Sequence, residues 1–230
     1  MGSPGFDRAA IRVVFLDVDD TLLDFDACAE QAMEQARGEL GVGPIDFPAF
    51  LRINLALWKQ LERGELTKQQ LFHERWSRVF EALGVEGDGP LFEAHFRRAL
   101  TQAAVPMPGA AALTAYLAGR YTLCAASNAP HMQQVRRLAQ AGLLQDLKRV
   151  FTSESCGAPK PSAAFFDACF TALAPLRPEQ TVMIGDSATA DVAGAAAYGM
   201  HTIWFDRCRA GGTAGAEHAV QSLEEILSLL

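Results

Sequence analysis

Two aspartates, Asp17 and Asp19, are the residues of this chain whose type and spacing most clearly suit chemistry. They follow a run of β-formers, Val13 to Leu16, which predicts a buried strand of a parallel sheet, and Thr21 follows two residues later. Alternate strand residues share a face, so the two carboxylates would lie close together and repel. A divalent cation or a shared proton would hold them there. An Asp-rich turn is the alternative, but Thr21 and the acidic residues downstream argue against it.

Polar residues also follow the other predicted central strands. Ser127 and Asn128 come after a predicted strand over 121–126, and Asp186 comes after another over 181–184. The carboxyl ends of parallel strands meet at one edge of a sheet, where open α/β folds bind their ligands. We therefore expect these side chains to converge with the two aspartates in one crevice.

The chemistry that suits this set is phosphoryl transfer. Asp17 is the candidate nucleophile, which would form an aspartyl-phosphate, and Asp19 is the candidate general acid and base. Carboxylate oxygens are the ligands that Mg²⁺ prefers, and the candidate metal set is Asp17, Asp19, Asp186 and Asp191. Asp191 stands at a predicted helix start, so it is either a ligand of a metal-held water or only a helix cap.

Phosphate oxygens need donors, and the chain offers several near these acids. Thr21, Ser127 and Asn128 supply hydroxyl and backbone N–H groups, the latter two just before a predicted helix. Lys160, between two prolines, could hold both Asp17 and the phosphate. A lysine beside proline in a surface loop is the alternative, but the other three motifs favour the functional interpretation.

The elements that must position these residues divide the chain in two. Residues 1–22 and 107–230 alternate strand and helix signals, which predicts a doubly wound, Rossmann-like α/β core with a parallel sheet. Residues 23–106 show only helical periodicity, with four helices, and predict an inserted all-helical cap domain. Hinges between the two parts are expected near Leu23 and Pro106.

Composition limits the partners. Half of the 230 residues are hydrophobic, so a sizeable core can be buried. The net charge is −7, which argues against nucleic acid or membrane binding through a basic surface. No apolar run approaches the ~18 residues of a membrane span, and Met1 to Arg8 contain no apolar signal core. Five scattered cysteines without a CxxC pair fit a reducing cytoplasm. We expect a cytoplasmic monomer or homodimer that acts on a small phosphomonoester.

Taken together, these residues resemble the four ordered motifs of the haloacid dehalogenase superfamily. The matching segments are Asp17-Val18-Asp19-Asp20-Thr21, Ser127-Asn128, Lys160-Pro161, and Gly185-Asp186-Ser187 with Asp191. The resemblance covers nearly the whole chain and implies an Mg²⁺-dependent phosphatase with a four-helix cap. Asp19 separates the phosphatases of this superfamily from its dehalogenases, which lack the second aspartate. A departure is Asn128-Ala129, where many members have Asn-Gly.

Among these phosphatases, the chain is most similar to bacterial house-cleaning pyrimidine 5′-nucleotidases. The similarity includes four candidate substrate residues in the cap segment, which are Phe25, Asn54, Trp58 and Arg75. Phe25 and Trp58 could stack on a base, while Asn54 and Arg75 could bond its edge or the ribose. The alternative interpretation is helix packing for the two aromatic residues and solvated helix positions for the two polar ones.

Two other functions compete with the nucleotidase. A sugar-phosphate or phosphoglycolate phosphatase would have the same core motifs and a different cap preference. A catalytically silent binding protein would be expected to have lost Asp17, Asp19, Lys160 or Asp186, and all four are present.

Overall fold

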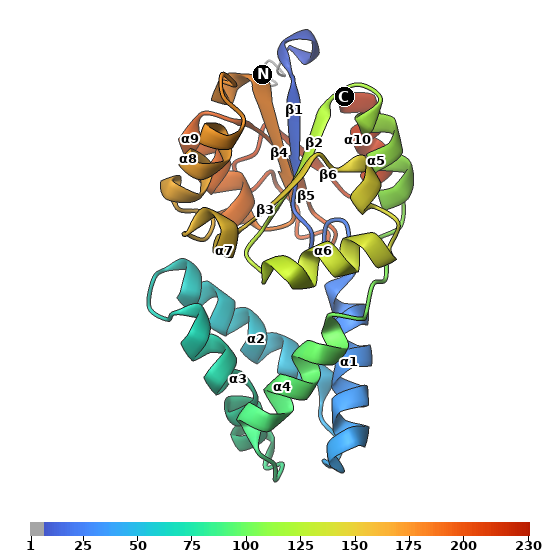
Figure 1. The fold of residues 1–230 in the computed structure, drawn as a ribbon, viewed down its shortest axis with the longest axis vertical. Helices are drawn as coiled ribbons and strands as arrows, with labels where there is room; N and C mark the ends of the chain where they lie inside the picture. The colour runs from blue at the N-terminus through green and yellow to red at the C-terminus, as the bar shows by residue number, and fades with distance from the viewer. Residues whose placement is uncertain (1–6) are drawn as a thin grey trace. The chain divides into compact units, whose positions relative to one another are not determined.

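The core sheet contains six parallel strands in the order β3-β2-β1-β4-β5-β6, with β1 in its interior (Figure 1). The computed structural model describes residues 7–230, so the prediction for Met1 to Arg8 lies mostly outside it. The strands are β1 (Val13–Leu16), β2 (Thr122–Ser127), β3 (Arg149–Thr152), β4 (Thr181–Gly185), β5 (His201–Phe205) and β6 (His218–Val220). The predicted doubly wound parallel sheet is confirmed.

Helices cover both faces of this sheet. On one face Val14 and Leu16 share a hydrophobic core with residues of α5 (Ala110–Ala118), α6 (His131–Gln140) and α10 (Leu223–Leu229). On the other face Val13 and Phe15 pack with residues of α8 (Ala163–Ala172) and α9 (Gly194–Tyr198), which Figure 1 shows beside β4. A strand that is buried on both faces needs a continuous apolar run, which is what β1 has.

The carboxyl ends of the three central strands lie level with one another. Leu16 of β1 is in register with Ala125 of β2 and with Ile184 of β4. The Asp17 N–H continues the ladder by donating to the Ile184 carbonyl at 2.9 Å. The polar residues that follow each strand are therefore delivered to one edge of the sheet.

Several elements of the core begin at capping side chains. Ser153 begins a short helix, α7 (Ser153–Cys156), and the Thr152 side chain caps it. Helix α8 begins at Ala163, with Ser162 as its cap. Asp191, predicted at a helix start, lies within a π-helical segment, η4 (Ala188–Ala193), that continues into α9. Strand β6 was missed because three residues form no recognisable β-run.

The second unit, residues 25–104, is entirely helical. It consists of α1 (Phe25–Leu40), α2 (Phe47–Glu62), α3 (Lys68–Leu83) and α4 (Gly89–Leu100). A capping box of Thr67 and Gln70 starts α3, and Gly84, with φ +64°, ends it. The buried Trp76 ring packs against Phe50 and Phe92, with centroids 4.8 and 4.3 Å away. The other unit runs to Asp24 and continues over Val105–Leu230.

Three short 3₁₀ turns complete the core unit, namely η1 (Arg8–Ala10), η2 (Leu144–Asp146) and η3 (Pro178–Gln180). Asp7 caps η1 by accepting a hydrogen bond from the Ala9 N–H, and the Gln180 carbonyl that ends η3 accepts from the Arg12 N–H beside β1. Across residues 7–230, no helix is long and apolar enough to cross a membrane.

Candidate active site

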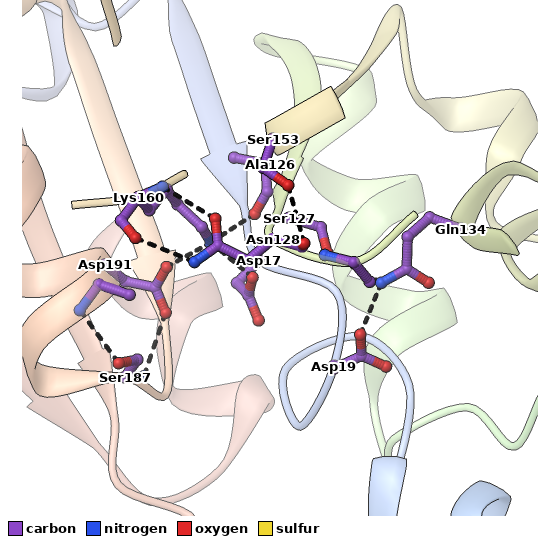
Figure 2. A network of polar contacts seen from close by, with 12 residues as sticks. Asp17, Asp19, Ala126, Ser127, Asn128, Gln134, Ser153, Lys160, Ser187 and Asp191 are labelled. Carbon is purple, nitrogen blue, oxygen red and sulfur yellow. Dashed lines mark hydrogen bonds and ion pairs between the residues drawn. The ribbon is translucent and has the colours of Figure 1, made fainter. Parts of the chain in front are cut away.

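A buried lysine joins two acids at the edge of the sheet (Figure 2). Lys160 is 2% exposed, and its Nζ donates to Asp17 Oδ1 at 2.6 Å and to Asp191 Oδ1 at 2.5 Å. The third donor of the ammonium group bonds the Ala126 carbonyl at the end of β2, at 2.5 Å. The lysine that could have been a surface loop residue is therefore inside the site, and it fixes the position of the Asp17 carboxylate.

The acids of this site outnumber its cations. Asp17, Asp186 and Asp191 each offer an oxygen, and these oxygens all lie within 4.8 Å of one another. Burial raises the pKa of Asp17 to about 8, against the attraction of Lys160, and Asp191 adds to the rise. Burial, then Asp17 and Asp191, raises the pKa of Asp186 well above its usual range. Burial alone would lower the pKa of Lys160, but Asp17 and Asp191 raise it above normal, so this residue stays charged.

The three carboxylates form a donor set that fits Mg²⁺. They supply hard oxygen ligands, and one lysine leaves their combined negative charge partly uncompensated. A Cβ on Gly185 would lie 2.2 Å from Asp191 Oδ2, so a residue without a side chain is required before Asp186. The Asp186 carbonyl is held by the indole N–H of Trp204 at 2.7 Å. The carboxylate of Asp19, predicted for the metal set, does not belong to this group.

Asp191 is not the cap of its helix. Ser187 caps η4 through its side chain, which accepts a hydrogen bond from the Ala190 N–H. Asp191 lies inside the segment, is 1% exposed, and accepts from the Ser187 N–H and from Lys160. The alternative interpretation of Asp191 as a helix cap was therefore wrong, because its carboxylate points back into the site.

The Lys160 loop is clamped by Asn128. The Asn128 amide donates to the Lys160 carbonyl at 3.0 Å, and its Oδ1 accepts from the Lys160 N–H at 2.8 Å. Ser153 in turn donates to the Asn128 carbonyl at 2.8 Å. The Asn128 side chain thus aligns the second and third motifs with each other, an arrangement that the sequence did not indicate.

Asp19 has two partners that sequence reasoning missed. Gln134 Nε2 donates to Asp19 Oδ2 at 2.6 Å, and Arg137 Nη1 donates to Oδ1. Gln134 also donates to the Ser127 hydroxyl at 2.9 Å, so Ser127 and Asp19 belong to one network (Figure 2). Gln134 and Arg137 are three residues apart on one face of α6, but in the sequence this spacing equally fits a solvated helix. Both are fully buried.

Comparison with known proteins agrees with this geometry. A model of the haloacid dehalogenase-like hydrolases matches residues 11–199. The chain belongs to this family. It is 38% identical to the pyrimidine 5′-nucleotidase PynA of Streptococcus pneumoniae over 85% of this chain and 84% of PynA. It is 29% identical to the pyrimidine 5′-nucleotidase YjjG of Escherichia coli over 84% of this chain and 85% of YjjG.

Solved structures give the same result for this haloacid dehalogenase-like hydrolase. The HAD-hydrolase YfnB of Bacillus subtilis, solved bound to magnesium, superposes with a TM-score of 0.88 and 29% identity. The match covers 95% of this chain and 98% of YfnB. The predictions of the family, of a hydrolase and of a helical cap on a Rossmann-like core are confirmed.

Two of the four candidate substrate residues of the hydrolase are buried inside the cap unit. Arg75 Nε and Nη2 donate to both oxygens of Glu93, at 3.0 and 2.7 Å, and Nη1 donates to Asn54 Oδ1 at 3.0 Å. All three residues are at most 5% exposed. The alternative interpretation of Asn54 and Arg75 as solvated was wrong, because both side chains are buried. The sequence did not show this, since the two residues lie on different helices and only the fold pairs them. Their proposed contacts with substrate stay a prediction.

The two aromatic candidates differ from this pair in exposure. Trp58 is partly buried and packs edge-on against Phe72, with ring centroids 6.3 Å apart, in a small cluster with Leu57 and Leu71. Phe25 is the first residue of α1 and is also partly buried. Thr21 is fully buried, and its hydroxyl has no hydrogen-bond partner within residues 7–230. The contacts proposed for these three residues stay predictions.

Proposed function

We propose that this haloacid dehalogenase-like phosphatase hydrolyses nucleoside 5′-monophosphates through an aspartyl-phosphate, with pyrimidine bases favoured. The observation that carries the reaction is the group of Asp17, Asp186 and Asp191, two of which are buried and hydrogen-bonded to Lys160. An excess of buried carboxylates is unfavourable for folding alone, and such groups are typical of sites that bind a cation and an anionic substrate.

Asp17 is the proposed nucleophile. One of its oxygens accepts from Lys160 at 2.6 Å and its backbone N–H is fixed to β4, so its orientation is set before substrate arrives. Attack on phosphorus breaks the ester bond and leaves the phosphoryl group on Asp17, which water then hydrolyses. Lys160 compensates part of the charge that the carboxylate and the phosphate bring together.

Asp19 is the proposed acid and base. It would give a proton to the leaving oxygen and then take one from the attacking water. Its two carboxylate oxygens are held by Gln134 and Arg137, which fix its distance from Asp17. Gln134 and Arg137 therefore act on the reaction by positioning Asp19.

Magnesium is the proposed cofactor, and Asp17, Asp186 and Asp191 are the proposed acidic groups of its site. The bound cation would neutralise the approaching carboxylate and phosphate groups. Asp186 is presented by β4 and anchored through its carbonyl to Trp204. Lys160, between Asp17 and Asp191, limits the repulsion within the acidic group.

The nucleotide substrate is supported by the relatives and by the cap segment. PynA and YjjG, each matched over most of its length, are named pyrimidine 5′-nucleotidases. Phe25 and Trp58 offer aromatic rings, and stacking is worth about 1–3 kcal/mol per base in single-strand binders. That energy favours a nucleotide over a bare sugar phosphate but does not select one base sharply. We therefore expect broad specificity among pyrimidine nucleotides.

A substrate panel tests this proposal. Phosphate release from nucleotides, sugar phosphates and phosphoglycolate would be compared by kcat/KM with Mg²⁺ present. If the proposal is right, pyrimidine 5′-monophosphates have the highest kcat/KM of the panel. A sugar phosphate or phosphoglycolate that leads by tenfold, or about 1.4 kcal/mol, would overturn it in favour of the alternative substrate class.

Trp58→Ala tests the stacking step separately. The loss in kcat/KM should be larger for a pyrimidine nucleotide than for a small phosphate ester that has no base. Leu57→Ala, in the neighbouring position of the same cluster, controls for a general loss of packing. An unchanged ranking of substrates in Trp58→Ala would exclude stacking on this ring even if nucleotides remain preferred.

A further inference from the structure

Two cysteines outside the active site lie in contact with each other. The Sγ atoms of Cys156 and Cys169 are 4.0 Å apart. Cys156 is the last residue of α7 and is partly exposed, whereas Cys169 lies in α8 and is buried. Neither residue takes part in the phosphatase chemistry described above. The pair places a partly exposed thiol beside a buried one, and a neighbouring thiol is what resolves a sulfenic acid into a disulfide.

Cys156 also lines a pocket on the core unit. The pocket has a volume of about 460 Å³ and is bordered by His131, Lys148, Arg149 and Ser155 in addition to Cys156. It lies beside β3, the edge strand of the sheet. A small polar oxidant can therefore reach Cys156 through the pocket, whereas Cys169 does not line the pocket and is buried among Phe165, Phe166 and other apolar residues.

The two thiols differ in acidity. A hydrogen bond from Cys169 lowers the pKa of Cys156 to about 7, although partial burial acts in the opposite direction. The same hydrogen bond, together with burial, raises the pKa of Cys169 above its usual value. The thiolate is the nucleophilic form of cysteine, so Cys156 is the member of the pair that reacts first.

We propose that Cys156 and Cys169 form a redox-modification site that a peroxide converts reversibly into a disulfide. In the first step the Cys156 thiolate attacks one oxygen of hydrogen peroxide, the O–O bond breaks, and the products are Cys156 sulfenic acid and hydroxide. In the second step the Cys169 sulfur attacks the sulfenic sulfur, an S–S bond forms, and water leaves with the Cys169 proton. A dithiol reverses the reaction by thiol–disulfide exchange and becomes a disulfide itself.

The local structure allows this closure. A disulfide needs its sulfur atoms at about 2.05 Å, so the two sulfurs must approach by about 2 Å. Cys156 ends a helix of only four residues and precedes Gly157, an exposed residue with open space around it. A Cβ on Gly157 would meet no atom within 4 Å, so the backbone after Cys156 has room to adjust. The disulfide would enclose the segment that carries Lys160, so the modification also restrains the loop of the active site.

Peptide mapping tests the proposal on the whole chain. The protein is treated with hydrogen peroxide, remaining thiols are alkylated, and digested peptides are analysed by mass spectrometry. We expect a Cys156–Cys169 cross-link that lacks two hydrogen atoms and disappears after treatment with a dithiol. Cys208, which is exposed and distant in sequence, should be alkylated as before when the cross-link has formed.

Three variants separate the steps. In Cys169→Ser, Cys156 should accumulate as a sulfenic acid that a cyclic 1,3-dione traps. In Cys156→Ser, a conservative change at a partly exposed position, Cys169 should remain a thiol and the cross-link should be lost. Cys208→Ser is the matched control and should form the cross-link at the wild-type rate. The proposal is overturned if Cys208 oxidises before Cys156, or if Cys169 links to Cys124 instead.

Discussion

Two buried networks of charge, one in each unit, show how the balance of charge separates a site from a structural element. In the core, three acids, Asp17, Asp186 and Asp191, lie close together, and Lys160 pairs with the first and the last of them. In the cap unit, Arg75 meets Glu93 in a two-point ion pair, with Asn54 on its third nitrogen. The cap network is neutral and its charged groups are paired, which is what a fold needs to bury charge. The core network retains an excess of negative charge, which makes it suited to binding a cation.

The largest expected effect is on activity when the core network loses its nucleophile. Asp17→Asn removes the reacting oxygen but keeps the size of the side chain. Activity should fall on the order of 10⁴–10⁶-fold, as when other enzymes lose a nucleophile. Measurement of kcat with a pyrimidine 5′-monophosphate and Mg²⁺ checks this.

Thermal unfolding of the same variant is the control. Asp17→Asn removes one of three neighbouring carboxylates, so its melting temperature should equal or exceed that of the wild type without metal. Wild-type activity in the variant would show that Asp17 is not the nucleophile. A large loss of stability would show that Asp17 supports the fold, as the charged groups of the cap network do.

The second effect concerns Asp19, which is bonded to Gln134 and Arg137 and lies outside the group of three acids. Asp19→Ala should lower kcat/KM for an alkyl phosphate by about 10²–10⁴-fold, the usual contribution of general acid catalysis. An aryl phosphate, whose phenolate leaves with less protonation, should lose much less. The measurement is the ratio of the two losses. Equal losses on both esters would mean that Asp19 only supports the structure of the site.

The sequence predicted that the core residues lie close together because they follow strands. Each of Asp17, Ser127 and Asp186 stands at the end of an apolar run, and the register of parallel strands brings such ends together. Lys160 follows no strand, and only its motif identified it in the sequence. In the structure its Nζ donates to Asp17, the contact that the sequence analysis expected.

The partners on helices could not be predicted in the same way. Arg137 is 118 residues from Asp19, and Arg75 is 18 residues from Glu93. A polar residue on an amphipathic helix has the same pattern whether it faces water or a buried partner, because the pattern reports only its own face. The pairing depends on how the helices pack. The π-helical segment that carries Asp191 could not be predicted for the same reason. The Asp191 carboxylate accepts hydrogen bonds from Lys160 and from the Ser187 N–H, and these contacts depend on the fold.

The third effect breaks the cap network. Arg75→Met leaves the buried Glu93 without its cation, which should cost about 3–5 kcal/mol of unfolding free energy. The double variant Arg75→Met/Glu93→Leu removes both charges and should recover most of that loss. Urea unfolding of the wild type, the two single variants and the double variant measures the coupling. If Arg75→Met keeps its stability and instead raises KM for a nucleotide, the cap network belongs to the substrate site.

The smallest effect is a pH dependence that distinguishes the two networks without removing either. The pKa of Asp17 is raised from 3.8 to about 8 in the folded protein without metal. A carboxyl whose folded pKa is raised contributes stability that is fully present below its unfolded pKa and is lost as the pH rises through the folded value. The metal-free wild type should therefore lose stability relative to Asp17→Asn between about pH 4 and pH 8.

The expected difference is on the order of 1 kcal/mol, or about 2–4 °C in melting temperature, since the charge of Lys160 offsets part of the cost of ionising Asp17. Melting curves of both proteins with a chelator, taken across this pH range, measure it. Mg²⁺ should then stabilise the wild type more near pH 8 than near pH 5, because protons and the cation compete for the same oxygens. Arg75→Met/Glu93→Leu, which leaves the core acids intact, should show the wild-type dependence on both pH and Mg²⁺. Parallel curves for the wild type and Asp17→Asn would mean that the excess charge of the core is balanced in the folded protein, and the distinction between the two networks would fail.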